Sequence, residues 1–479
     1  MPQKGTHCVS GSLFKRRTLI KGKLNRMKKD KIISGFSKLS KVGKIRWVVE
    51  HFFKDPENVT RELMSFWHQD AEQQRILDGF SENTISNFYL PYGIAPNVVV
   101  NGRTYAVPMV IEESSVVAAA SSAAKFWMDR GGFHAEVVST KKVGQVHFSW
   151  NGPMHQLETV FEALKSRLLQ DAAPITENMR KRGGGVLDIA LLDMTHLEPD
   201  YYQLNVDFET CDSMGANFIN TVLEEFGQSI VQFINTHPAI DPAYREASVI
   251  MAILSNYTPE CLVRAWVECP VEQIDCLSPG IGKEAFSQRF QKAVRIAHLD
   301  PHRAATHNKG IYNGVDAVVL ATGNDFRAIE ACGHTYAARD GQYRSLSYCT
   351  IEEGRFKFWL DLPIAIGTVG GLTRLHPIAR RSLELLGNPS ATELMEVIAA
   401  VGLAQNFAAV RSLVTTGIQK GHMKMHLMNI LNHLGANDKE ILAAATYFTD
   451  KVVSFAAVRD FLELSRRNPA PGKMLAFKK

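Results

Sequence analysis

Cysteine is scarce in this sequence, and no two cysteines form a CxxC pair. Seven Cys are spread over 479 residues, which disfavours a disulfide-stapled scaffold and a structural zinc site and indicates a reducing, cytoplasmic compartment. A run of eighteen apolar residues is also absent, so we expect no ordinary transmembrane helix. With 45% apolar and 22% charged residues, the chain is typical of a globular protein of about three domains.

The two common phosphate-binding signatures are missing as well. The sequence contains neither GxxxxGK[ST] nor a GxGxxG that follows a strand, so a doubly wound dinucleotide-binding domain is not supported. Three other glycine-rich segments could direct backbone N–H groups at a phosphate, with a tight turn as the alternative for each. They are RGGGVLD at 182–188, DSMGAN at 212–217 and GTVGG at 367–371.

Positive charge is concentrated at one end of the chain. Residues 1–46 hold fourteen Lys and Arg and one acid, a net charge of +13, whereas the remainder holds 40 Lys and Arg and 48 acids, a net charge of −8. Such a tail can bind nucleic acid or anionic lipid. Because chain termini are often loosely ordered, we instead expect residues 1–34 to be a disordered extension, with neither nucleic acid nor a membrane as a partner.

The first third of the chain predicts helices, then a hairpin, then one long helix. Residues 35–80 have the apolar spacing of helices. Asn-Gly at 101–102, between two apolar runs, predicts a β-hairpin. An alanine-rich helix is expected over 116–130, capped at its start by Ser114 or Ser115 and ended by a Gly-Gly pair.

The rest of the chain predicts both sheet and helix. Between 140 and 260, VGQVHFSW and YYQLNVDFE alternate like half-buried strands, while LETVFEALKSRLLQ and ANFINTVLEEFGQSIVQFI are helical by period. This mixture indicates an α+β sandwich. From about 285 to 418 the pattern is mainly helical, with AVVLATG as one short buried strand, and the last sixty residues predict two or three helices.

Two acids follow apolar runs and precede helices. Glu113 lies in PMVIEESSVVAAAS, between an expected strand and a helix, where a partly desolvated carboxyl could act as a general acid. Asp325 ends VVLATGND and precedes the helical segment FRAIEA. For each acid, the alternative role is to cap the helix that follows.

The segment DPHRAATHNKGIYNG is dense in side chains that bind anions and carbonyl groups. Lys309 precedes a glycine at what we interpret as an irregular turn, and it is a candidate to stabilise an oxyanion. Arg303 is a candidate for bidentate carboxylate binding. The alternative is a polar surface loop.

His422 follows Gly421 and opens an amphipathic stretch, HMKMHLMNILNHLG. A histidine beside a glycine hinge near the C-terminus suits a proton donor on a closing flap. His422, His426 and His433 share one stripe of the predicted helix, but further ligands and an HExxH motif are lacking, so no metal is expected.

Taken together, these segments resemble the hydroxymethylglutaryl-coenzyme A (HMG-CoA) reductases of the soluble prokaryotic class, class II. The resemblance spans residues 84–424, and its most specific part is THNKG combined with TGND and a late GHM. The sequence departs from the family pattern at Ser114 and Ser213, and it matches weakly over 140–180. The matching segments are LPYGIAPN, VPMVIEESSVVAAAS, GGGVLD, DSMGAN, DPHRAATHNKGIYNG, ATGND, GTVGG, GLAQN and GIQKGHM.

The resemblance implies a four-electron reduction of HMG-CoA to mevalonate and coenzyme A, or the reverse. Lys309 would stabilise the oxyanion and Glu113 would donate a proton to the aldehyde. Asp325 would hydrogen-bond both, and His422 would protonate the coenzyme A thiolate. The residues that fall where the family holds the hydroxymethylglutaryl group are Arg303, Ser115 and Asn313.

The resemblance also implies a nicotinamide dinucleotide and no metal. A carboxylate at Asp188 accepts hydrogen bonds from a ribose 2′-hydroxyl and repels a 2′-phosphate, which favours NAD(H). Lys181 and Arg182, just upstream, could accommodate a phosphate and so admit NADP(H). The expected dinucleotide-binding residues are Asp188, Asp212, Met214, Gly215, Asn217, Gly184 and Gly185.

The fold implied is α+β, with a large, mainly helical domain interrupted by a small ferredoxin-like α/β sandwich domain that binds the dinucleotide without a Rossmann fold. The implied boundaries are 35–138 with 262–418 for the large domain, 139–261 for the small one, and 419–479 for a C-terminal helical flap. The family's active site lies at a subunit interface, so a homodimer or higher oligomer is expected. The alternatives are another acyl-CoA enzyme, such as a thioesterase, and a binding protein that uses the basic tail.

Overall fold

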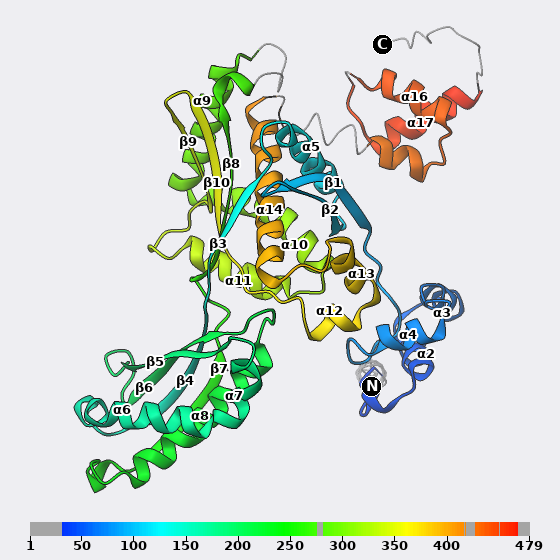
Figure 1. Ribbon diagram of the computed structural model, residues 1–479. Helices are drawn as coiled ribbons and strands as arrows, with labels where there is room; N and C mark the ends of the chain where they lie inside the picture. The colour runs from blue at the N-terminus through cyan, green and yellow to red at the C-terminus, as the bar shows by residue number, and fades with distance from the viewer. Residues whose placement is uncertain (1–30, 275–280, 416, 418–426, 450, 468–479) are drawn as a thin grey trace, which may run out of the picture. The chain divides into compact units, whose positions relative to one another are not determined.

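The computed structural model describes residues 31–274, 281–415, 417, 427–449 and 451–467. The chain divides into two compact units, residues 1–90 and residues 91–479. Helices lie in both units, and the second also contains a two-stranded and two four-stranded sheets (Figure 1). The expectation of a mixed helix-and-sheet protein is therefore confirmed.

The described part of the first unit is helical, as its apolar spacing predicts. Ser40, Asp55 and Asp70 each begin an α-helix by accepting hydrogen bonds from backbone N–H groups of the first turn. Residues 1–30, most of the predicted extension, lie outside the described residues. The elements are η1 (Phe36–Lys38), α2 (Lys41–Phe52), α3 (Pro56–Ser65) and α4 (Ala71–Asp78).

The second unit opens with the predicted hairpin, formed by β1 (Tyr92–Val100) and β2 (Arg103–Val110). Asn101 and Gly102 form its two-residue turn, both with positive φ (49° and 80°), as a type I′ turn requires. The helix α5 (Val116–Met128) follows. Ser115 occupies its N-cap position, as predicted, at φ 80°, but its side chain accepts no capping hydrogen bond.

A four-stranded antiparallel sheet forms the centre of this unit. Its strand order is β3-β8-β10-β9. The hairpin of β9 and β10 was not expected within a mainly helical region, and its turn residues Glu353 and Gly354 both have positive φ. The strands are β3 (His134–Thr140), β8 (Cys261–Pro270), β9 (Ser347–Glu352) and β10 (Arg355–Pro363).

Six helices of this unit lie between residues 283 and 414 of the chain. The longest, α14, runs through the main apolar core. Among the described residues it is the helix long and apolar enough to cross a membrane, yet 72% of its apolar stretch is buried, as in the core helix of a folded protein. The helices are α9 (Lys283–Leu299), α10 (Pro301–Ala321), α11 (Phe326–Ala337), α12 (Gly371–Leu375), α13 (Pro377–Leu385) and α14 (Ala391–Val414).

Helix α10 corrects two expectations. The DPHRAATHNKGIYNG segment is neither a loop nor an irregular turn, and AVVLATG is not a strand, because both belong to this one helix. It packs closely and antiparallel against α14, so apolar residues are needed on most of its sides and its periodicity is weak. Gly314 permits the approach, since a Cβ there would lie 2.9 Å from the Val401 carbonyl oxygen.

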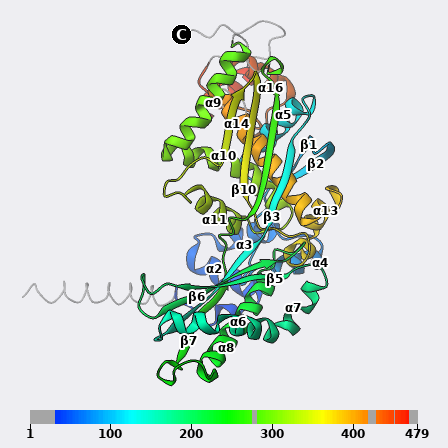
Figure 2. The same cartoon turned by 60° about the vertical axis from the view of Figure 1, so that its left-hand side comes forward.

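A second four-stranded antiparallel sheet lies between β3 and β8 in the chain, in the order β5-β6-β4-β7. The helices α6 and α8 lie against this sheet (Figure 2). They share one apolar core with its inward side chains. The strands and helices expected over 140–260 are thus confirmed. They are β4 (Lys142–Trp150), α6 (Met154–Asp171), α7 (Ala173–Arg180), β5 (Gly185–Asp193), β6 (Tyr201–Glu209), α8 (Ala216–Thr236) and β7 (Ala247–Leu254).

The C-terminal part is helical, as expected. Residues 427–433 are helical and are followed by α16 (Asp438–Tyr447) and α17 (Phe455–Arg467). Leu431 and Val458 are fully buried in a small apolar cluster that these helices share. This part therefore has a core of its own.

Candidate active site

A pocket of about 1000 Å³ lies among the start of α5, helix α10 and the C-terminal half of α14. Most of the residues expected to bind substrate or to react line it. This set consists of Glu113, Ser115, Arg303, Lys309 and Asn313. The structure therefore brings together five side chains that lie up to 200 residues apart in the sequence.

Helical geometry explains why α10 presents several polar groups to one space. Arg303, Thr306, Lys309 and Asn313 recur at intervals of three or four residues and so share one face of the helix. The opposite face carries buried residues such as Ile311 and Val315. A helix with its polar stripe over a pocket thus replaces the loop that the sequence suggested.

Glu113 and Lys309 form an ion pair in this pocket. The Lys309 ammonium donates to Oε2 of Glu113 at 2.7 Å, and the two side chains are 61% and 37% exposed. Exposed ion pairs stabilise a fold little. The pair is better suited to chemistry, because an ammonium can stabilise a developing oxyanion while the adjacent carboxyl moves a proton.

Arg303 has no hydrogen bond or ion pair within the described residues. Burial lowers the pKa of its guanidinium below the ordinary value. A half-buried guanidinium without a counter-ion is well suited to bind a carboxylate from solution. Ser115 Oγ, which does not cap α5, remains available on the same pocket wall.

Asp325 is the N-cap of α11, as the alternative interpretation held. It accepts hydrogen bonds from the backbone N–H groups of Arg327 and Ala328 and pairs with the Arg327 guanidinium at 3.0 Å. Burial alone would raise the pKa of Asp325, but these contacts bring it below its usual value. Its expected hydrogen bonds to Lys309 and Glu113 are absent within one chain.

The distance along α10 explains that absence. Lys309 lies twelve residues before the helix ends at Ala321, which is about 18 Å at about 1.5 Å per residue. Asp325 follows that end. Lys309, near the middle of α10, and Asp325, beyond its last residue, are therefore too far apart for a hydrogen bond within one chain.

Two of the glycine-rich segments meet near the C-terminal end of α10. Backbone N–H groups of Thr368 and Ala391 donate to Asp212, to its carbonyl at 2.9 Å and its Oδ1 at 2.7 Å. A Cβ at Gly367 would lie 2.5 Å from the Met214 nitrogen, so only glycine permits this packing. Gly215 begins α8 at φ 88°, which leaves unpaired N–H groups of a helix start where a phosphate can bind.

The third glycine-rich segment lies beside the residues that precede Asp212. A Cβ at Gly184 would lie 2.6 Å from the Glu209 carbonyl oxygen, so the backbone passes close there. Gly185 opens β5, and Asp188 follows on that strand. The expected dinucleotide-binding segments are therefore close together, with backbone crowding that excludes side chains.

Asp188 has a partner that the sequence did not suggest. Lys165 Nζ, from α6, donates to its carboxylate at 2.6 Å, and this hydrogen bond holds the pKa of Asp188 below its usual value. Lys165 lies within an amphipathic helical segment that carries no motif. Only the packing of α6 on the sheet reveals it as a cation at the expected ribose site.

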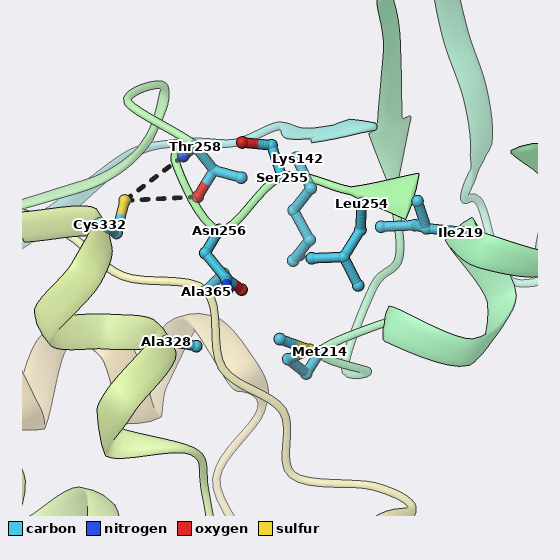
Figure 3. Close-up of a pocket in the computed structure, with 10 residues that line it drawn as sticks. All are labelled: Lys142, Met214, Ile219, Leu254, Ser255, Asn256, Thr258, Ala328, Cys332 and Ala365. Atoms are coloured by element: carbon cyan, nitrogen blue, oxygen red, sulfur yellow. Dashed lines mark hydrogen bonds between the residues drawn. The ribbon is translucent and has the colours of Figure 1, made fainter. Parts of the chain in front are cut away.

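A small cavity links the Asp212 loop to α11. Its volume is about 10 Å³, room for about one water and for no substrate. In Figure 3, Met214, Ile219 and Leu254 approach from one side and Ala328 and Cys332 from the other. The chain thus packs the expected dinucleotide loop against the helix that Asp325 begins.

His422, the expected proton donor, lies outside the described residues. Among the described residues, no group of three or more His, Cys, Asp or Glu side chains could hold a metal ion.

One region of the unit can stabilise negative charge on a substrate oxygen, and another has a helix start suited to a dinucleotide phosphate. Hydride transfer to a carbonyl group needs both regions. An oxidoreductase is the class of enzyme that this combination defines.

Comparison with known proteins makes the class specific. The family model for hydroxymethylglutaryl-coenzyme A reductase matches residues 46–427. The chain belongs to the HMG-CoA reductase family, prokaryotic type. This confirms the reductase interpretation over the thioesterase and the tail-driven binding protein.

Two of the relatives are an archaeal and a bacterial protein. The 3-hydroxy-3-methylglutaryl-coenzyme A reductase of Archaeoglobus fulgidus is 35% identical over 428 residues, which are 89% of this chain and 92% of that protein. A probable reductase of Borreliella burgdorferi is 30% identical, over 84% and 89% of the two chains. A structure of the class II enzyme of Streptococcus pneumoniae, bound to NADPH in open conformations, has a TM-score of 0.66 and 36% identity, and the match covers 86% of this chain and 100% of that one.

Proposed function

We propose that this chain interconverts HMG-CoA and mevalonate by two successive two-electron steps, with Glu113, Lys309, Asp325 and His422 as its catalytic residues. The ion pair of Lys309 and Glu113 at 2.7 Å, beside the unpaired Arg303 guanidinium, is the observation that carries the proposal. Two reduced nicotinamides, bound one after the other, would each supply one hydride, the first for the thioester carbon and the second for the aldehyde carbon that follows.

The chain's own residues handle charge and protons. Lys309 Nζ donates to the substrate oxygen as it becomes an oxyanion. Glu113, in contact with that ammonium, delivers the proton that completes the alcohol. His422 protonates the departing coenzyme A thiolate, which prevents its return to the aldehyde.

The pocket also holds the acyl group. Arg303 would bind its free carboxylate with two parallel N–H groups. Ser115 Oγ and the Asn313 amide would hydrogen-bond its remaining oxygens. Both line the same pocket as Arg303, so the acyl group is oriented with its thioester carbon near Lys309.

We propose that the dinucleotide is bound by Gly184 and Gly185, by the loop from Asp212 to Asn217, and by Asp188. The crowded glycine backbone and the start of α8 fit a pyrophosphate. Asp188 would accept a hydrogen bond from the ribose 2′-hydroxyl and so favour NAD(H). Lys165 beside it supplies a cation for a 2′-phosphate, so NADP(H) is a second substrate, as bound in the Streptococcus pneumoniae structure.

The active site requires two copies of the chain. The Asp212 loop contacts the first residue of α14, whereas the pocket lies near its last turn at Arg411. These points are twenty residues, or about 30 Å, apart along the helix at about 1.5 Å per residue. A homodimer resolves the separation if Asp325 and the dinucleotide of one copy face Glu113 and Lys309 of the other.

The same proposal assigns the small sheet and its helices, within 139–261, as a ferredoxin-like dinucleotide-binding domain. The strand order β5-β6-β4-β7, with α6 and α8 packed on one face, supports this. The five described cysteines are free, which suits a reducing cytoplasm.

Cofactor stoichiometry tests the reaction. With HMG-CoA and either reduced nicotinamide, we expect about two cofactors oxidised for each thiol released. Lys309→Ala should lower kcat by at least about 100-fold, because it removes the oxyanion's main donor. Lys357→Ala, on a remote strand beside Glu268, is the matched control. Thiol release without oxidation would contradict the proposal and support a thioesterase.

A further inference from the structure

Three permanently charged cations line the pocket, and only one of them has a counter-ion. Lys309 pairs with Glu113. No carboxylate of the described residues lies within 4 Å of the Arg303 or Arg411 guanidinium. Two of the three cations therefore lack an ion pair among the described residues, although Asp300, the N-cap of α10, also lines the pocket.

Arg411 is held in place by neutral groups. Its guanidinium donates to Ser122 Oγ on α5 at 2.9 Å and lies 5.9 Å from the Phe407 ring. Burial lowers its pKa below the ordinary value. Arginine has five N–H donors, and a desolvated guanidinium without an anion costs free energy.

The chain that follows offers no anion either. Residues 415–437, directly after α14, contain no Asp or Glu. The contact between Arg411 and Ser122 joins two residues 289 positions apart, on the two helices that form one wall of the pocket. Arg411 is thus oriented before any ligand arrives, which lowers the entropic cost of binding.

We propose that Arg411 is a second anion-binding side chain of this pocket and takes a carboxylate or phosphate oxygen of the acyl-coenzyme A. The proposal rests on the proposed function, which supplies a substrate with a carboxylate at one end and phosphates at the other. Two unpaired guanidinium groups in one pocket match a ligand with two separate anionic groups. The acyl carboxylate and the coenzyme A phosphates share this chemistry.

Equilibrium binding distinguishes the two sources without any turnover. Coenzyme A and free 3-hydroxy-3-methylglutarate are titrated separately into the full chain by calorimetry. Arg411→Gln should lower the affinity for one probe by about tenfold or more, because a charge-assisted hydrogen bond is lost. The affinity for the other probe should be unchanged. Weaker binding of coenzyme A identifies a phosphate as the partner of Arg411. Weaker binding of hydroxymethylglutarate identifies the carboxylate. Arg411→Lys should recover part of the loss, since it keeps the charge without the planar fork.

Two further variants keep the proposal falsifiable. Arg381→Gln, exposed on α13 and paired with Glu384, controls for the loss of any arginine. Ser122→Ala leaves the charge in place and should lower the affinity for the same probe by a smaller factor. This variant still tests the proposal if Arg411→Gln does not fold. Wild-type affinity for both probes in Arg411→Gln and Ser122→Ala would overturn the proposal. A wild-type chain that binds neither probe would overturn the proposed function as well.

Discussion

We propose that cofactor choice depends on Asp188 and Lys165, two side chains that lie 2.6 Å apart. The carboxylate suits a ribose 2′-hydroxyl and opposes a 2′-phosphate, whereas the ammonium suits the phosphate. Each also reduces the other's effect, because the pair is already neutral overall. We therefore expect a preference for NADH that is modest.

Substitution at this pair changes the preference in opposite directions. Asp188→Ala removes the repulsion of a 2′-phosphate and should narrow the ratio of kcat/KM for NADH over NADPH by about 3- to 10-fold, a modest effect because the pair is solvent-exposed. Lys165→Met should widen it. The ratio is measured with both cofactors under one buffer condition. An unchanged ratio in Asp188→Ala would refute the assignment of Asp188.

At this scale, the sequence was most informative where a residue belongs to a motif. The family resemblance carried Glu113, Ser115, Arg303, Lys309 and Asn313, and all five line one pocket. Lys165 and Arg411 stand in ordinary helical segments and meet their partners only through tertiary packing. No local pattern could have identified them.

Among the elements, α10 links both regions of the site, and a buried acid holds it against α11. Asp316 on α10 has a buried Oδ1 without a hydrogen-bond partner among the described residues. Burial first, and then the neighbouring Glu330 of α11, raise the pKa of Asp316 to about 8. Tyr312, one turn earlier on α10, is also buried and interacts with Asp316 and Glu330. The contact is therefore made by two acidic side chains, and the raised pKa of Asp316 favours its protonated form at neutral pH.

This acid makes stability depend on pH. Because the pKa of Asp316 is raised from 3.8 in the unfolded chain to about 8 in the folded one, its protonated form favours folding below about pH 4, and this contribution is lost as the pH rises to about 8. Asp316→Asn should flatten that decline, by at most about 1.4 kcal/mol per pH unit. Thermal unfolding midpoints of both proteins at several pH values measure it. A constant difference between the two midpoints across pH 5–8 would contradict the account.

The elements most easily read from sequence were those with a clear period or turn. The Asn-Gly hairpin and the amphipathic helices α6 and α8 are examples. The prediction for helix α10 was wrong because the helix is buried on most sides. The β-branched residues near its end have the composition of a strand, and its polar residues have the composition of a loop. The Glu-Gly turn of the β9–β10 hairpin is a weaker sequence signal than Asn-Gly, so that hairpin was not predicted.

In the whole molecule, the two regions needed for the reaction lie far apart along α10 and at opposite ends of α14. Sequence could list the residues of both regions but not their separation, because α10 was not recognised as a straight helix. One chain therefore carries both halves of the site without joining them. We therefore propose that catalysis is a property of an assembled dimer.

Mixing two inactive variants tests this central claim most directly. Lys309→Ala and Asp325→Ala chains are each assayed alone and after co-expression. If each site takes Lys309 from one copy and Asp325 from the other, every mixed dimer has one intact site, and random pairing restores about one quarter of wild-type activity. If both residues serve a site within one chain, every site keeps a defect. The co-expressed pair would then stay as inactive as either variant alone, which would contradict the shared site.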